Sequence, residues 1–273
     1  MLDITVLQPN YYSGENPDEK IAEFLLDGIK NAKENSLVVL PEYSNAGGLS
    51  DKDALLKALP RAKTMLDKAK QLAKEKSCYI AINLLEERDN KFRNSTYLLD
   101  KGGNVAFVYD KIHLPPAEVA FGVVAGDGAC VCDLDGIRFA FMTCYDVYFN
   151  EQVEYMAKFK PDVIVIPGYQ RGERTDIIKA QAKLTAFRCN AYIARASYSM
   201  NTNERGGNSM IVYPDGQISK NLGSEVGSLS DTINEKQKYM RPAGFGGEMV
   251  RNDDFINDGL CAKTFENAPK SIK

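Results

Sequence analysis

The sequence predicts an α/β fold in which helices and strands pack in layers within one domain. Three observations support this prediction. Strand-like and helix-like segments alternate along the chain, several neighbouring strands are joined by tight turns, and no long linker or repeat divides the 273 residues. Because helical crossovers favour parallel strands and tight turns favour antiparallel strands, we expect a mixed sheet. The chain is also long enough to bury a sizeable core.

The first half of the chain alternates short apolar strands with two helical patterns. Residues 16–35 place apolar side chains three or four positions apart, which is typical of one face of a helix. Residues 51–77 form a second helical pattern, which we expect Pro60 to break because proline lacks a backbone N–H. Strands are predicted at residues 2–8, 36–42, 78–87, 92–100 and 104–111, and a Lys-Gly-Gly turn joins the last two.

The second half continues the same alternation and then loses it. We expect a strand pair within 129–144 and a hairpin at 207–219 that turns at Pro-Asp-Gly. Between them, helices are predicted at 150–159 and 174–189 and strands at 162–168 and 191–197. From about residue 231 the pattern weakens. We therefore expect one domain over residues 1–273, with 231–273 as a C-terminal tail that packs on the body or on a neighbouring subunit.

Composition and charge argue against several classes of partner. The net charge is −3 and no basic block is present, so we expect no nucleic-acid partner. No apolar run approaches the ~18 residues of a membrane helix, and the first ten residues do not resemble a signal peptide. We therefore expect a cytoplasmic protein without membrane contact, and its six cysteines to be free thiols.

One cysteine, Cys144, stands out because it ends the apolar run at 139–143. A reactive thiol commonly has a histidine base, but His113 is the single histidine, and a role in shaping its loop explains it as well. Cys130 and Cys132 suggest a zinc or redox site. Their Cys-x-Cys spacing differs from that of usual zinc sites, and two core cysteines on one strand face explain the pair. We expect neither metal nor cofactor.

Three chemically useful side chains follow apolar strand patterns. Glu42 ends the strand at 36–42, and Lys111 ends the strand at 104–111. Cys144 follows the apolar run at 139–143. Taken singly, each is explained by a polar residue at a strand end. Because strand ends converge on a crevice in layered α/β folds, we expect the three side chains to meet there.

The chain resembles the nitrilase superfamily of carbon–nitrogen hydrolases. The segments LVVLPEYSNAGG, YDKIHLPP and TCYDVYFNE are similar to the three signature blocks of that family, and the resemblance extends from residue 2 to about residue 220. It implies a four-layer αββα sandwich with two mixed β-sheets, and association through the helical face into a homodimer or higher homo-oligomer. It requires no cofactor.

The resemblance also implies roles for individual residues. Glu42 matches the general base, Lys111 the cation that stabilises an oxyanion, and Cys144 the nucleophile. Glu118 matches a second glutamate that lies near the site, and the backbone N–H of Tyr145 is expected to help bind the oxyanion. Asp146 and Glu151 match the acids of the cysteine block.

The cysteine block departs from the family pattern in two places. Members often have Arg-Phe-Pro-Glu where this chain has Tyr148-Phe149-Asn150-Glu151. True nitrilases often have Trp-Glu after the cysteine, whereas this chain has Tyr145-Asp146 and no tryptophan. The sequence therefore resembles the amidase and carbamoylase branches, and the wall of the substrate pocket is the part that the resemblance leaves open.

These observations predict hydrolysis of a non-peptide C–N bond in a small amide or N-carbamoyl compound. The thiolate attacks the carbonyl carbon, an acyl thioester forms, and ammonia or an amine leaves. Nitrile hydrolysis, acyl transfer on the same triad, and a non-catalytic binding protein on this fold are the alternatives. By position, the pocket is expected to be lined by Tyr43, Asn45, Tyr148, Tyr169, Arg171 and Arg174.

Overall fold

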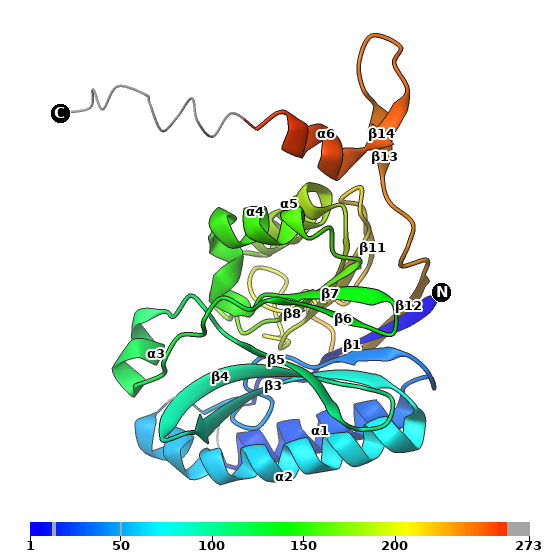
Figure 1. Cartoon of the computed structure of the whole chain (residues 1–273). Coiled ribbons are helices and arrows are strands. Elements are labelled where there is room, and N and C mark those ends of the chain that lie inside the picture. Colours follow the sequence, from blue (N-terminus) through cyan, green and yellow to red (C-terminus); the bar gives the residue numbers. More distant parts are fainter. Residues whose placement is uncertain (13–14, 50, 261–273) are drawn as a thin grey trace, which may run out of the picture.

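Two six-stranded mixed sheets face each other, and helices cover the outer face of each sheet (Figure 1). The computed structural model of the chain describes residues 1–12, 15–49 and 51–260. The expected four-layer αββα sandwich is confirmed. In the part of the chain that is described, no helix is both long and apolar enough to span a lipid bilayer.

The first sheet has the strand order β12-β1-β2-β3-β4-β5, with its three central strands parallel. The crossovers between these strands are α1 (Pro17–Asn31) and α2 (Lys52–Lys76). Antiparallel pairs extend the sheet on both sides. Its strands are β1 (Leu2–Gln8), β2 (Leu37–Val39), β3 (Tyr79–Arg88), β4 (Lys91–Leu99), β5 (Val105–Asp110) and β12 (Gly227–Ile233).

The second sheet has the order β11-β10-β9-β8-β7-β6, again with a parallel centre and antiparallel edges. The helices α4 (Asn150–Lys158) and α5 (Thr175–Cys189) cover it. A short 3₁₀ helix, η1 (Cys144–Tyr148), follows β7. The strands are β6 (Val131–Leu134), β7 (Ile137–Phe141), β8 (Val163–Pro167), β9 (Tyr192–Ala196), β10 (Met210–Val212) and β11 (Ile218–Asn221).

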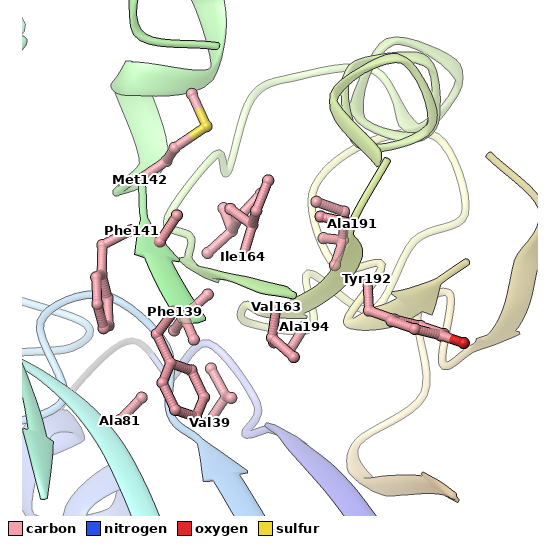
Figure 2. Packing of buried hydrophobic residues seen from close by; sticks show 14 of the residues in the cluster. Val39, Ala81, Phe139, Phe141, Met142, Val163, Ile164, Ala191, Tyr192 and Ala194 are labelled. Atoms are coloured by element: carbon pink, nitrogen blue, oxygen red, sulfur yellow. The ribbon is translucent and has the colours of Figure 1, made fainter. Parts of the chain in front are cut away.

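The main hydrophobic core lies between the two sheets. Phe139 of β7 points toward Val39 and Ala81 of the first sheet, and all three are fully buried (Figure 2). Burying a large apolar side chain contributes about 1.5–3 kcal/mol, so this layer is what holds the sheets together. Their packing fixes where the strand ends meet.

The expected break at Pro60 is wrong, because α2 continues as one helix from Lys52 to Lys76. Pro60 and Leu56, whose carbonyl loses its N–H partner to the proline, both lie on the exposed side of the helix. Water can solvate that carbonyl, while the opposite face of α2 buries Met65, Ala69 and Leu72. The stability gained by burying that face outweighs the cost of leaving the Leu56 carbonyl without a helical N–H partner.

Five short elements carry no clear signal in the sequence. The helix α3 (Pro116–Phe121) follows the Lys111 block, and β12 pairs with β1 at the edge of the first sheet. Beyond them lie the hairpin β13 (Met240–Pro242) and β14 (Met249–Arg251), and the helix α6 (Asn252–Asp258). The tail packs on α5 of its own chain as far as it is described, since Asn252 bonds to the carbonyl of Phe187.

We predict that Pro60→Ala stabilises the protein. Alanine restores the missing N–H donor and raises the free energy of unfolding by about 1–3 kcal/mol, partly offset by a more flexible unfolded chain. Urea denaturation measures the change. Pro116→Ala is the control, because Pro116 stands in the first turn of α3, where the N–H has no helical partner. A destabilised Pro60→Ala variant would contradict this account of the helix.

Candidate active site

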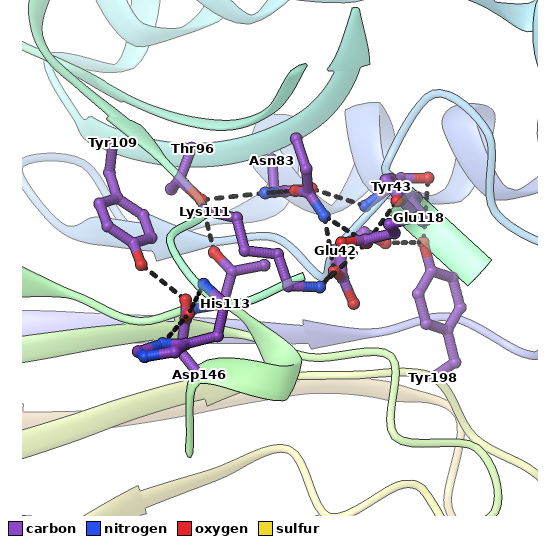
Figure 3. A network of polar contacts seen from close by, with 12 residues as sticks. Glu42, Tyr43, Asn83, Thr96, Tyr109, Lys111, His113, Glu118, Asp146 and Tyr198 are labelled. Carbon is purple, nitrogen blue, oxygen red and sulfur yellow. Dashed lines mark hydrogen bonds and ion pairs between the residues drawn. The ribbon is translucent and has the colours of Figure 1, made fainter. Parts of the chain in front are cut away.

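Glu42, Lys111 and Cys144 come together although they follow three different strands, β2, β5 and β7. Lys111 Nζ lies 2.8 Å from Glu42 Oε1, and the Cys144 thiol is hydrogen-bonded to the carboxylate of Glu42. Figure 3 shows the Lys111 side chain directed at Glu42 and Glu118. Strand ends from both sheets therefore meet at one point between the layers.

Lys111 is a buried cation shared by two carboxylates. Its Nζ is 2.8 Å from Glu42 Oε1 and 2.9 Å from Glu118 Oε1, and its side chain is 1% exposed. Burial alone would lower the pKa of Lys111, but the charges of Glu42 and Glu118 and the hydrogen bond to Glu42 outweigh it and raise the pKa above its usual value. The ammonium therefore stays charged at any physiological pH.

The two carboxylate oxygens of Glu118 differ in their hydrogen bonding. Its Oε1 accepts hydrogen bonds from Tyr43 Oη at 2.5 Å, Asn94 Nδ2 at 2.9 Å and Lys111 Nζ at 2.9 Å. Its Oε2 is buried and has no hydrogen-bond partner within the described part of the chain. Burial raises the pKa of Glu118, Lys111 lowers it, and the charge of Glu42 raises it again. An unpaired buried oxygen is costly, so Oε2 is ready to accept a donor from a bound molecule.

Asn94, on β4, connects the two glutamates and was missed by the sequence analysis. Its Nδ2 donates to Glu42 Oε1 at 2.8 Å and to Glu118 Oε1 at 2.9 Å. Its Oδ1 accepts from Asn83 Nδ2 at 2.7 Å, which fixes the orientation of the amide. Asn83 Oδ1 in turn accepts from the N–H of Tyr43 and holds the turn that carries Glu42. The signal was available, because the strand Asn94-Ser95-Thr96 is unusually polar.

Cys144 starts η1 in a left-handed backbone conformation, with φ of 48°. Such a conformation is uncommon for a residue with a side chain and requires support from its surroundings. Thr143 and Asp146 supply that support as a capping box at the start of η1. The residue as a whole is half-buried, and its backbone is held in place.

The pKa of the Cys144 thiol is raised well above its usual value, first by burial and then by the charge and hydrogen bond of Glu42. Lys111 and the backbone of Tyr169 act in the opposite direction, the latter through a hydrogen bond. The resting thiol is therefore protonated, with a carboxylate beside it that can accept the proton.

His113 belongs to the support of the site. Its Nδ1 lies 3.0 Å from Asp146 Oδ1, its Nε2 lies 2.9 Å from Glu151, and its ring stacks on Phe149 at 3.9 Å. Asp146 also accepts from Tyr109 Oη at 2.6 Å and from the N–H of Thr143. Asp146 thus ties the loop after Lys111 to the helix that begins at Cys144. The geometry favours the loop-shaping role of His113.

Two of the residues expected to line the pocket lie close to the three central groups. Tyr43 donates to Glu118, and its ring meets that of Tyr169 edge-on, with centroids 5.9 Å apart. Tyr169 in turn bonds to Cys144 through its backbone. Arg171 lies over the Tyr169 ring, 4.6 Å from its centroid, and therefore borders the same group of residues.

The other expected pocket residues have different surroundings. The amide of Asn45 is used entirely on backbone groups of Leu85 and Ala58. Tyr148 is exposed and donates to Glu173, while the ring of Tyr145 packs between Tyr148 and Phe149. Arg174 pairs with Asp176 at the start of α5, and its side chain is 72% exposed. The structure does not bring Asn45 or Arg174 to the three central groups.

Arg195, in the middle of β9, is a further charged residue that the sequence analysis did not single out. It is 2% exposed and donates to the carbonyls of Gly207 and Asn208 and to Gln170 Oε1, at 2.7, 2.8 and 3.0 Å. Burial lowers its pKa to about 10, and the nearby Cys144 acts in the opposite direction. An arginine inside the apolar run at 191–197 was the available signal.

Cys130 and Cys132 were considered as metal ligands in the sequence. Within residues 1–12, 15–49 and 51–260, no group of three or more His, Cys, Asp or Glu side chains is arranged to hold a metal ion. Cys78, Cys130, Cys132, Cys144 and Cys189 are free thiols, and burial raises the pKa of Cys130 and Cys132 to about 12. Cys261 lies outside the described residues.

The chain belongs to the carbon-nitrogen hydrolase family, which it matches over residues 4–233. The resemblance to the nitrilase superfamily is thereby confirmed. An amidase from Nesterenkonia sp. has the same fold, with a TM-score of 0.75 and 19% identity over 97% of this chain and 95% of that one. A mutant of the Nesterenkonia AN1 amidase, assigned to the nitrilase superfamily, also gives 0.75 and 19%, over 97% of this chain and 96% of that one.

Among proteins of similar sequence, 2-oxoglutaramate amidase from Bacillus subtilis (strain 168) is 26% identical over 227 residues. The match covers 81% of this chain and 86% of that protein. A protein named hydrolase in agr operon, from Staphylococcus lugdunensis, is 25% identical over 213 residues, which are 74% of this chain and 88% of that one. The similarity therefore extends over most of each protein.

We predict that His113 stabilises the fold mainly in its protonated form. The hydrogen bond to Asp146 raises the pKa of His113 in the folded state. Its contribution is therefore fully present below about pH 6.5, the unfolded-state value, and is lost as the pH rises through the folded-state pKa. The difference in free energy of unfolding between the wild type and His113→Gln should be larger at about pH 6 than at about pH 9. An equal difference at both would contradict the role of the imidazolium.

Proposed function

We propose that the protein hydrolyses the C–N bond of small amides through an acyl thioester on Cys144. The observation that carries this proposal is that the Cys144 thiol meets a buried carboxylate, Glu42, which also holds the buried ammonium of Lys111 at 2.8 Å. These three groups supply a nucleophile, a base and a fixed positive charge within one network. The family and its amidase members support the same reaction class.

In the first half of the reaction, Glu42 takes the thiol proton as the sulfur of Cys144 attacks the carbonyl carbon. An S–C bond forms, and the carbonyl oxygen becomes an oxyanion. Glu42 then gives its proton to the nitrogen as the C–N bond breaks, so ammonia or an amine leaves neutral. The raised thiol pKa makes this base necessary, because little thiolate exists without it.

In the second half, water attacks the thioester carbon while Glu42 accepts one of its protons. The S–C bond breaks, the proton returns to sulfur, and a carboxylic acid is released. The same carboxylate therefore serves both halves and ends in its starting form. Its hydrogen bonds from Lys111 and Asn94 keep it in position throughout.

The oxyanion would be stabilised by Lys111 Nζ and by the backbone N–H of Tyr145. Tyr145 is the second residue of η1, where N–H groups have no helical partner. Loss of one such donor typically lowers the rate by about 10²–10³. Glu118 would accept an N–H of the substrate amide through Oε2, its unpaired oxygen. That contact would orient the leaving nitrogen toward Glu42.

The alternative reactions at this site differ in the substrate, the acyl acceptor and the product released. An N-carbamoyl compound would follow the same steps and release carbon dioxide after its ammonia. A nitrile lacks the N–H that Glu118 Oε2 would bind, and an acyl acceptor other than water would make the protein an acyltransferase. A binding protein on this fold would have no use for a thiol hydrogen-bonded to its base. The buried network favours amide hydrolysis.

We also propose a homodimer formed through the helical face. Large apolar side chains on α4 and α5, and at the end of α4, remain exposed: Tyr155, Phe159, Ile177 and Leu184. In Figure 1 the hairpin β13–β14 and α6 lie beyond these helices, on the same side of the molecule. A second subunit packed there would cover the apolar side chains and lie against the hairpin β13–β14 and α6.

We predict that Cys144→Ala, Glu42→Gln and Lys111→Met each lower kcat/KM for small amides by at least about 10³-fold. Ammonia release from a panel of amides, N-carbamoyl compounds and nitriles provides the measurement. Cys132→Ala is the matched control, since Cys132 lies on β6 outside the network, and it should keep wild-type activity. Full activity in Cys144→Ala would refute the proposal.

We further predict that Glu42→Gln separates thiol reactivity from turnover. Removing the carboxylate removes a charge that raises the pKa of Cys144, while Lys111 still lowers it. The thiol pKa should fall, so iodoacetamide should alkylate Cys144 faster at about pH 7 although hydrolysis is lost. Peptide mapping by mass spectrometry locates the alkylated cysteine. Slower alkylation than in the wild type would contradict the assigned contact.

A further inference from the structure

Arg171 lies at the border of the proposed active site, and no acidic partner pairs with it among the residues that the structure describes. Its guanidinium donates to Tyr11 Oη at 2.6 Å, and no ion pair of Arg171 occurs among the described residues. Glu173, the nearest acid along the chain, is occupied by Tyr148 and by the N–H of Arg174. A guanidinium has five donors, so the hydrogen bond to Tyr11 leaves most of them available to a ligand.

Aromatic rings hold the Arg171 guanidinium in one orientation. Its central carbon lies 4.6 Å from the ring centroid of Tyr169 and 5.2 Å from that of Tyr11. These two rings are 5.9 Å apart, and the Tyr169 ring is fixed by the N–H of Gly48, which donates to its hydroxyl at 3.1 Å. A long exposed side chain is thereby oriented before any ligand arrives, which reduces the entropy lost on binding.

The same tyrosine connects Arg171 to the reacting thiol. The backbone of Tyr169 hydrogen-bonds to Cys144, and the Tyr169 ring meets Tyr43, which donates to Glu118. Arg171 is two residues beyond that backbone contact. A substrate whose amide carbon lies at Cys144 would therefore extend its far end along the Tyr43–Tyr169 wall toward the guanidinium.

We propose that Arg171 binds a carboxylate at the far end of the substrate, so that the preferred substrates are ω-amides of dicarboxylic acids. A planar carboxylate matches the paired N–H donors of a guanidinium. The proposal rests on the amide hydrolysis proposed above and specifies its substrate class.

The test compares two series of amides with the same number of chain atoms. One series is the monoamides of dicarboxylic acids with one to four methylene groups, and the other has a methyl group in place of the carboxylate. We expect the wild type to prefer the acids, with the chain length of highest kcat/KM reporting the distance between Cys144 and Arg171. Arg171→Gln should lower the acid-to-neutral ratio of kcat/KM by about 10–100-fold, mainly through KM.

Two further variants distinguish recognition from a structural role. Arg171→Lys keeps the charge but loses the planar pair of donors, so its ratio should lie between those of the wild type and Arg171→Gln. Arg174→Gln is the matched control three residues away, because Arg174 is already paired with Asp176, and its ratio should equal that of the wild type.

The outcomes separate this inference from the proposed function. An equal loss on both series in Arg171→Gln would show that Arg171 only supports Tyr169, and an equal fall of the ratio in Arg174→Gln would indicate a general charge effect. Either result, or a wild type that hydrolyses neutral amides without preferring acids, overturns the inference alone. A wild type that hydrolyses neither series contradicts the amide hydrolysis itself.

Discussion

The structure of the site depends on one buried ammonium that two buried carboxylates share. Glu42 and Glu118 both place an oxygen within 2.9 Å of Lys111 Nζ, and Asn94 donates to the same two oxygens. Without the cation, two carboxylates so close together would repel each other in a medium that screens charge poorly. Removing one partner of such a buried pair typically costs about 3–5 kcal/mol. The cation therefore stabilises the fold as well as the proposed oxyanion.

This interaction exists only when the two sheets are packed. Glu42 and Lys111 follow strands of the first sheet, whereas Cys144 follows β7 of the second, and Phe139 of β7 packs against Val39 of β2. A second link runs from Asp146 through its bond to Tyr109 of β5. The apolar layer thus sets the distance between sheets, and the polar contacts at its edge set the positions of the reacting groups.

The sequence predicted the layered fold and the meeting of Glu42, Lys111 and Cys144, because apolar strands that end in polar residues converge at one edge. It did not predict α3, whose six residues give too short a pattern, or β12, whose alternate residues face solvent. Asn94 and Arg195 were missed because their roles come from partners on distant segments. The predicted break at Pro60 was wrong because helix propensity does not indicate which face of the helix a residue occupies. The proline ring lies on the exposed face of α2.

The most direct test of the central claim is to detect the acyl group on Cys144. The wild type would be mixed with a small amide that it hydrolyses, quenched in acid within the first turnovers, and digested for mass spectrometry. The account predicts an added mass equal to the acyl group on the peptide that contains Cys144, and on no other cysteine peptide. It also predicts that the adduct disappears with hydroxylamine, as a thioester does. Rapid turnover with no adduct on Cys144 at any quench time, or an adduct on another cysteine, would contradict it.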